Sequence, residues 1–408
     1  MNRANLEVPF NRPDVDEADI ARVVATLRSG WITTGPVVRE FETALKRYLA
    51  VSRVVCLNSA TAGMELVLRA LGIGPGDEVI TTVYTYAATA NVVRHSGARL
   101  VLVDTAPGSF LIDPQAAAAA LTPRTKALMP VDFAGLPADC THLRAAADAC
   151  RADFVPSNAF QEATGRPVIL LDAPHAFGSL YAGERVARDA DFSVYSFHAV
   201  KNLTTAEGGA VAWRGLTGEG SEVELEAEFE RRLRLLALHG QSKDALAKMS
   251  AGSWEYDIEI SGYKHNMTDM QAALAIGQLE RYAAQLARRR EICRRYEEGL
   301  PEPVFVHPFV GVGEDLPSFH IYPLRLRGFD ETRRNALIAS LAARGIAANV
   351  HFKPLPLFTA FRDEFDIKNY PNAWETYSSE VTLPLYPALT DEQVEHVIRS
   401  LRTIVGLD

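Results

Sequence analysis

Short apolar runs alternate with amphipathic stretches along the first 280 residues of the chain. Runs of this kind, bounded by turn residues, are typical of buried strands. We expect strands at Arg53–Leu57, Glu78–Thr82, Leu100–Asp104, Thr125–Val131, Val168–Asp172, Ala190–Phe197 and Ala210–Trp213. Apolar residues at helical spacing predict helices from the acidic segment Asp14–Glu17 to Ser29 and at Val37–Leu49, Met64–Leu71, Ala87–His95, Gln115–Leu121, Cys140–Ala152 and Leu225–Leu238. Strands that alternate with helices predict a largely parallel α/β sheet covered on both faces.

The pattern changes after about residue 301. A strand at Ser318–Leu326, a helix at Arg333–Arg344 and a second strand at Ala347–Val350 indicate a smaller α/β unit. We therefore expect a large domain over residues 1–280, which begins with an extended arm, and a small C-terminal domain over residues 281–408.

Two further segments are expected at the surface of the protein. Residues 153–166 are interpreted as a surface insertion that leaves the following strand intact. Residues 282–299 are rich in arginine and are expected to form a solvated connecting helix.

Composition narrows the class of protein. The 408 residues are 48% hydrophobic and 23% charged, as in ordinary globular proteins, and the net charge of −9 comes without a basic patch, which argues against nucleic-acid binding. The four cysteines are irregularly spaced and include no CxxC motif, which argues against a zinc site or a disulfide framework. The sequence has no apolar signal segment and no run long enough to span a membrane. We expect a cytoplasmic protein without a metal site.

Lys201 follows one predicted strand and precedes another. Most loop lysines are solvated. A lysine that is partly desolvated between buried strands has a lowered pKa, however, and can form a Schiff base with an aldehyde cofactor. Twenty-nine residues earlier, the apolar run Val168–Leu171 ends in Asp172. Open α/β sheets bind their ligands at the carboxyl ends of their strands, so this context favours a functional role for Lys201.

The segment Asn58–Gly63 consists of small and hydroxyl residues that open a helix. Free backbone N–H groups and the positive end of the helix dipole suit a phosphate there. The same pattern is also that of an ordinary helix N-cap. Both interpretations are open from these residues alone.

With these motifs the chain resembles the DegT/DnrJ/StrS family of sugar aminotransferases, which use pyridoxal phosphate (PLP). The resemblance rests on four motifs in order and extends over nearly the whole chain. They are Asn58–Gly63, Asp172–Ala176, Ser196–His198 with Lys201–Asn202, and Gly262–Asp269. It implies the fold type I aminotransferase architecture, with a mainly parallel seven-stranded sheet in the large domain.

The resemblance also implies roles for individual residues. Lys201 would be catalytic and would also hold the cofactor. Asp172 would lie beside the pyridine nitrogen, Tyr86 over the ring, and His175 would bond the ring oxygen or brace Asp172. Ser196, Ala60 and Thr61 would hold the phosphate, and Asn266 would reach the cofactor of a neighbouring subunit. The candidates for substrate binding are Trp31, Thr33, Lys264 and His351, although Trp31 and His351 also suit packing roles.

The implied reaction moves an amino group from glutamate to a nucleotide-linked 4-keto or 3-keto sugar, in the biosynthesis of amino sugars and polysaccharides. A homodimer with shared active sites is expected, because the loop around Asn266 would serve the neighbour. Two alternatives are a PLP-dependent sugar dehydratase and a non-catalytic sensor or regulatory protein. The dehydratases replace the lysine by histidine, and a regulatory protein would be expected to lose Lys201 or Asp172; the sequence retains both.

Overall fold

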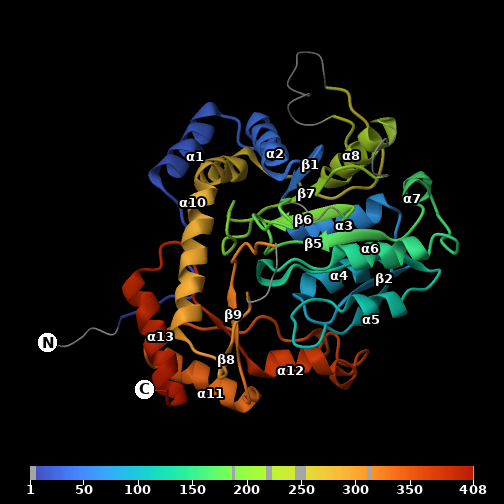
Figure 1. Ribbon diagram of the computed structural model, residues 1–408. Helices are drawn as coiled ribbons and strands as arrows, with labels where there is room; N and C mark the ends of the chain where they lie inside the picture. Colours follow the sequence, from blue (N-terminus) through green and yellow to red (C-terminus); the bar gives the residue numbers. More distant parts are fainter. Residues whose placement is uncertain (1–5, 186–188, 217–222, 244–253, 310–314, 408) are drawn as a thin grey trace.

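The computed structural model describes residues 6–185, 189–216, 223–243, 254–309 and 315–407 (Figure 1). Its main feature is a seven-stranded sheet with the order β1-β7-β6-β5-β4-β2-β3. The strands are β1 (Arg53–Leu57), β2 (Glu78–Thr82), β3 (Arg99–Val103), β4 (Thr125–Met129), β5 (Val168–Asp172), β6 (Phe192–Ser196) and β7 (Gly209–Trp213). Only β7 runs antiparallel to its neighbours among these strands, so the expected mainly parallel sheet is confirmed.

Helices cover both faces of this sheet, as Figure 1 shows. Those of the first 280 residues are α1 (Glu17–Ser29), α2 (Pro36–Leu49), α3 (Ala60–Ala70), α4 (Ala87–Ser96), α5 (Pro114–Ala119), α6 (Cys140–Ala149), α7 (Ala159–Thr164), α8 (Val223–Ala237) and the start of α10 (Asp269–Gly299), with the short 3-10 turn η1 (Phe133–Gly135). None of the described helices is both long enough and apolar enough to cross a bilayer.

Alternation along each strand divides the core into two layers. Val54 and Cys56 of β1 pack into the layer that contains α2 and α6, whereas Val55 and Leu57 pack into the layer that contains α3 and α4. Successive side chains of a strand point to opposite faces, so a strand with no polar interruption must be covered on both sides. The apolar runs of the sequence therefore encode a fully buried sheet.

The C-terminal part forms a second, smaller sheet. Its antiparallel order is β10-β9-β8. The elements are β8 (Phe305–Val306), β9 (Tyr322–Leu326), α11 (Glu331–Ala342), η2 (Leu355–Leu357), η3 (Ile367–Asn369), α12 (Pro371–Ser379), β10 (Glu380–Leu383) and α13 (Asp391–Val405). The predicted strand Ala347–Val350 is wrong: this segment contributes only an isolated bridge from Asn349 to Thr382.

The helix α10 is longer and better buried than its sequence suggests. It runs unbroken through the expected domain boundary at residue 280. The expectation of a solvated helix over residues 282–299 is wrong for one face, where Arg289, Ile292 and Tyr296 are buried. Arg289 donates to the carbonyl oxygens of His320 (3.1 Å) and Leu385 (3.0 Å), so a residue that looks solvated by type anchors two loops of the C-terminal part.

The segment 153–166 is also only partly a surface insertion. It contains α7, whose Phe160 and Gln161 are buried, and it ends at the buried Arg166. The guanidinium of Arg166 donates two hydrogen bonds to Asp191, of 2.8 and 2.6 Å, and Asp191 also accepts the N–H of Ile169 at 2.7 Å. This ion pair fixes the N-terminal ends of β5 and β6. The same two strands deliver Asp172 and Ser196 at their opposite ends.

We predict that Asp191→Ala lowers the free energy of unfolding by about 3 kcal/mol, because it removes the buried charge partner of the Arg166 guanidinium and leaves only the more exposed Asp148. Denaturant titration of the purified protein measures this loss. Glu280→Ala removes the exposed ion pair with Arg22 and is the matched control, expected to cost less than about 1 kcal/mol. Equal costs for the two variants would contradict the assignment.

Candidate active site

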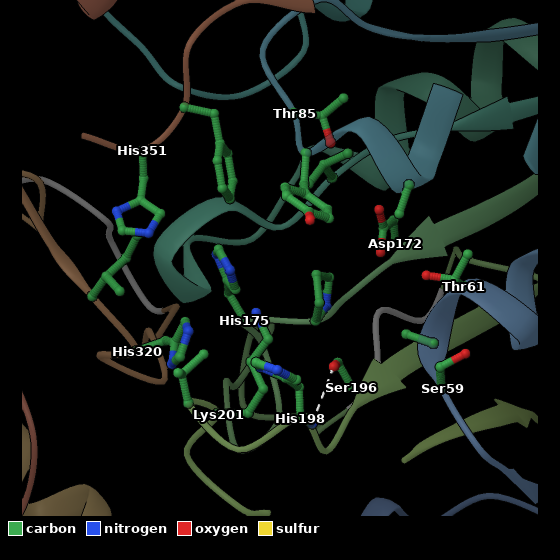
Figure 2. Close-up of a pocket in the computed structure, with 18 of the residues that line it drawn as sticks. Ser59, Thr61, Thr85, Asp172, His175, Ser196, His198, Lys201, His320 and His351 are labelled. Carbon is green, nitrogen blue, oxygen red and sulfur yellow. Dashed lines mark hydrogen bonds between the residues drawn. The ribbon is translucent and has the colours of Figure 1, made fainter. Parts of the chain in front are cut away.

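A cavity of about 430 Å³ opens at the carboxyl ends of the central strands (Figure 2). Asp172 is the last residue of β5 and Ser196 the last residue of β6, and the loop after β2 contributes Thr85 and Tyr86. The predicted site residues that line the cavity are Ala60, Thr61, Tyr86, Asp172, His175, Ser196, Lys201 and His351. The structure thus brings together predicted site residues that lie up to 291 residues apart in the sequence, from Ala60 to His351.

Asp172 combines full burial with an incomplete set of hydrogen bonds. Its Oδ2 accepts from the Thr89 hydroxyl at 2.7 Å, whereas its Oδ1 is buried and has no partner among the described residues. Burial raises the pKa of Asp172 to about 6, against the opposing effects of Thr89 and the positive charge of Lys201. A buried carboxylate oxygen without a donor is costly, so this atom is suited to receive an N–H from a ligand.

Lys201 occupies the loop between β6 and β7, and its side chain lines the cavity. Its backbone N–H donates to His198 O at 2.9 Å, whereas its Nζ makes no hydrogen bond or ion pair with the described residues. Burial lowers the pKa of Lys201 to about 8, and Asp172 opposes that shift. The amine is therefore free of partners and is neutral in a substantial fraction of molecules near neutral pH.

The N-terminus of α3 forms another wall of the cavity. Ser59 is the N-cap and accepts the N–H of Ala62 at 3.1 Å. The N–H groups of Ala60 and Thr61 have no acceptor among the described residues, as expected for a first helical turn. A Cβ added to Gly209 would lie 2.4 Å from the Ala60 nitrogen. Since Gly209 pairs with Ser196, its missing side chain lets the helix start approach that serine. These groups together can hold a phosphate.

The rings of His175 and His320 are in contact in a tilted arrangement, with centroids 4.4 Å apart and an interplanar angle of 42°. The Ala134 N–H donates to His175 Nδ1 at 3.1 Å, so the proton of this neutral ring resides on Nε2. Burial, together with the positive charge of Lys201, holds the pKa of both histidines well below the usual value. His175 makes no hydrogen bond to Asp172 in the described structure, and the suggestion that it braces that carboxylate is not supported.

Four predicted residues, Trp31, Thr33, Lys264 and Asn266, do not line this cavity. They lie together on an adjoining surface: Trp31 Nε1 donates to Thr34 O (3.1 Å), Asn266 Nδ2 donates to Thr34 Oγ1 (2.7 Å), Lys264 Nζ donates to Asn266 Oδ1 (2.6 Å), and Asp269 N donates to Thr33 O (3.1 Å). Within the described residues, none of the four side chains lines the cavity.

Sequence reasoning missed several residues that shape the site. Thr89 bonds Asp172 from α4, and Asn202 accepts from His320 Nδ1 at 2.9 Å, with that proton placed on Nδ1. Phe10 and Asn11 of the N-terminal arm also line the cavity. Asn202 stands beside Lys201 in the sequence and belonged to a recognised motif. Thr89, Phe10 and Asn11 have no sequence motif that marks them, because each reaches the site through contacts with residues far away in the sequence.

The arrangement fits the three polar ends of PLP. A free amine can bond an aldehyde carbon, the unpartnered carboxylate oxygen can accept a pyridinium N–H, and the unpaired N–H groups of Ala60 and Thr61 can receive a phosphate. Tyr86, which is 66% exposed, leaves its ring available to pack on a planar ligand.

Comparison with known proteins gives a consistent result. A family model described as the DegT/DnrJ/EryC1/StrS aminotransferase family matches residues 13–402. The spore coat polysaccharide biosynthesis protein SpsC of Bacillus subtilis (strain 168) is 36% identical over 411 residues, which are 99% of either chain.

Solved structures agree with this match. The PMP-form of Spr1654 from Streptococcus pneumoniae, provisionally described as a sugar aminotransferase, has a TM-score of 0.93 and 44% identity over 98% of this chain and 99% of that one, and a PLP-form is also known. Helicobacter pylori PseC, an aminotransferase involved in the biosynthesis of pseudoaminic acid, has a TM-score of 0.83 and 28% identity over 98% and 99% of the two chains. The chain therefore belongs to the DegT/DnrJ/EryC1/StrS aminotransferase family.

Proposed function

We propose that this PLP-dependent aminotransferase transfers an amino group from glutamate to a nucleotide-linked keto sugar and so forms an amino sugar. The observation that carries the proposal is the pairing, in one cavity, of the unbonded amine of Lys201 with the unpartnered carboxylate oxygen of Asp172. A dehydratase or a regulatory protein of the same fold has no need of both groups.

In this proposal, different residues of the cavity lining bind different parts of the cofactor. With PLP bound, Asp172 Oδ1 would accept a hydrogen bond from the pyridinium N–H and so keep that nitrogen protonated, while Thr89 orients the carboxylate through Oδ2. Ala60, Thr61 and Ser196 would bind the phosphate, and Tyr86 would pack on the ring. PLP, when bound, supplies the electron sink that stabilises negative charge at the substrate carbon.

Lys201 moves the proton. Its Nζ takes a proton from the Cα of the amino donor and, in the second half of the reaction, returns one to the carbon of the keto group. A pKa lowered to about 8 suits an amine that must act as both base and acid near neutral pH. The histidines His175 and His320 stay neutral, so they line the site without competing for that proton.

The proposed substrate class is based on similarity to named sugar enzymes and on the residues that line the cavity. SpsC is named for polysaccharide biosynthesis and PseC for an acidic sugar, which supports a sugar acceptor. The described cavity lining contains no arginine, so the site presents imidazole and hydroxyl groups that suit hydroxyl-rich ligands. The nucleotide would extend toward the open mouth of the cavity.

A homodimer with shared sites is part of the proposal. Lys264 and Asn266 lie outside the cavity of their own protomer, next to a second hollow lined by Ser59, Thr61 and His265. In a dimer they would reach the phosphate of the neighbouring cofactor or the substrate beside it. Trp31 and Thr33 would lie at the same subunit interface.

Lys201→Ala is expected to abolish the absorbance band above about 400 nm that PLP gives when bound to a lysine. With the native protein, addition of L-glutamate should bleach this band, because the amino group is transferred to the cofactor. Ultraviolet–visible titration measures both. Lys353→Ala removes a lysine that does not line the cavity and is the control. A band that survives in Lys201→Ala would contradict the role of Lys201.

Gly209→Ala is expected to weaken PLP binding at least about tenfold, because the new Cβ displaces the N–H groups that hold the phosphate and a charge-assisted hydrogen bond is worth about 1.5–3 kcal/mol. Fluorescence titration of the apoprotein measures the dissociation constant. Gly74→Ala is the matched control, since its Cβ would meet no atom closer than 3.4 Å. The thermal transition of each apoprotein separates loss of binding from loss of fold.

The acceptor is tested with UDP-linked and dTDP-linked 4-keto-6-deoxyhexoses, a nucleotide-linked 3-keto sugar and the same keto sugars without nucleotide. After the native enzyme is converted with glutamate, the correct acceptor restores the visible band, and mass spectrometry detects an amino sugar. We expect at least one nucleotide-linked sugar to react much faster than its free counterpart. Conversion of keto acids alone would refute the sugar assignment.

A further inference from the structure

His351 is held in the cavity wall by its own backbone. Its N–H donates to Glu380 Oε2 at 3.0 Å, and its carbonyl oxygen accepts the Tyr84 hydroxyl at 2.8 Å. Its ring stacks on Phe10, with centroids 5.7 Å apart. Figure 2 shows the ring on the side of the cavity opposite Asp172. The residue is thus fixed at the substrate end of the site.

Behind the ring lies a chain of hydrogen bonds. His351 Nδ1 is 2.9 Å from Thr382 Oγ1, and Thr382 Oγ1 also bonds Glu380 Oε1. The other ring nitrogen, Nε2, has no partner among the described residues, and the ring lines the cavity. Three side chains, of His351, Thr382 and Glu380, therefore form a relay from the cavity to a fully buried carboxyl group.

The hydroxyl of Thr382 has a single hydrogen, which couples the two ends of the relay. When Glu380 is ionised, Thr382 donates to it and must accept from His351 Nδ1–H, which leaves Nε2 with a lone pair. When Glu380 is protonated, Oε1–H donates to Thr382, which donates in turn to Nδ1, and Nε2 carries the hydrogen. The state of Glu380 thus decides whether His351 offers the cavity an acceptor or a donor.

The surroundings of Glu380 allow both states. Arg334 of α11 donates to the carbonyl oxygens of Tyr377 and Glu380, both at 3.0 Å, and makes no hydrogen bond with the Glu380 carboxylate within the described part of the chain. Burial raises the pKa of Glu380 to about 8, against the donors on Thr382 and His351 and the charge of Arg334. The other titratable groups nearby are Tyr84, at the end of β2, and Arg325, on β9, both of which interact electrostatically with this cluster. Lys201 is the charge that faces His351 from the cavity.

We propose that Glu380 is a positioning residue that sets, through Thr382, the tautomer of His351, and that His351 Nε2 is the hydrogen-bonding group that distinguishes the hydroxyl of the keto sugar from the carboxylate of the amino donor. This rests on the proposed function for the identity of the two substrates. An Nε2–H donates to a carboxylate or to a sugar hydroxyl, whereas an Nε2 lone pair accepts from the hydroxyl and repels the carboxylate. One site can then serve both halves of the reaction with a neutral histidine.

The first test reads the tautomer directly and needs no substrate. The holoenzyme is labelled with ¹⁵N-histidine, and the ring-nitrogen shifts of His351, assigned by their loss in His351→Gln, are followed from pH 6.5 to 9.5. We expect the hydrogen to reside on Nε2 at low pH and on Nδ1 at high pH. A tautomer that does not change across this range would overturn the relay.

Glu380→Gln sharpens this test. The N–H of His351 requires an oxygen beside it, so the glutamine must turn its NH₂ group toward Thr382. Thr382 then donates to Nδ1, and the Nε2–H form should persist at every pH. Thr382→Val disconnects the relay and should abolish the pH response, while Thr382→Ser should restore it. If Glu380→Gln follows the native pH response, the proposal is wrong.

The second test separates the two substrates kinetically at pH 8.5. Glu380→Gln holds the Nε2–H form, so the KM for glutamate should fall several-fold because its carboxylate gains a donor. The KM for the active keto sugar should stay within about twofold, because a hydroxyl can accept from Nε2–H as well as donate to an Nε2 lone pair. Both enzymes contain Lys201 at the same pH, so its ionisation cancels in the comparison. An equal effect on both substrates would indicate a merely structural role. If no keto sugar reacts with the native enzyme, the proposed function fails, while the tautomer test still decides the relay.

Discussion

The site depends on one constraint, the burial of a carboxylate and an amine in the same cavity without a bond between them. Asp172 bonds Thr89 through one oxygen, and among the described residues neither its other oxygen nor the amine of Lys201 has a hydrogen-bond partner. Burial alone would favour the neutral form of each group, and the attraction between them moderates both pKa shifts. A ligand that satisfies both groups recovers this desolvation cost, so the apoprotein is prepared for its cofactor.

The scaffold meets this constraint by stiffening the strands at both ends. The ion pair of Arg166 and Asp191 secures the start of β5 and β6. At the other end, the Asp172 N–H donates to Pro130 O and the Asp132 N–H donates to Asp172 O, which extends the pairing of β4 and β5 beyond the strands. These main-chain hydrogen bonds fix the backbone of Asp172 and so keep its carboxylate in the cavity.

The C-terminal part completes the site rather than merely covering it. Ser318 N donates to Ser179 Oγ, His320 bonds Asn202 beside Lys201, and Arg289 holds the carbonyl oxygen of His320 from α10. His320 and His351 reach the cavity from this part and face His175 from the loop after β5, and burial lowers the pKa of all three. Because these rings are neutral, the position of the hydrogen on each ring determines whether a nitrogen that faces the cavity donates or accepts. Their hydrogen-bond partners therefore decide what the substrate end recognises.

The sequence by itself determined the elements that depend on local pattern. Apolar runs identified every strand of the large sheet, and short motifs brought Asp172, Lys201, Ser196 and the start of α3 to attention, because a strand end or helix start positions a residue through its immediate neighbours. The strand expected at Ala347–Val350 failed, since a single bridge to Thr382 replaces it.

Only the tertiary structure decided the contacts between distant segments. Arginine is usually exposed, but Arg166 and Arg289 are buried. Their partners Asp191, His320 and Leu385 lie 25 to 96 residues away in the sequence, so no local pattern reveals these contacts. The relay connects Glu380 and His351, which are 29 residues apart, through the hydroxyl of one threonine. Spacing along the chain carries no information on such pairs, since the tertiary packing of strands, helices and loops brings them together.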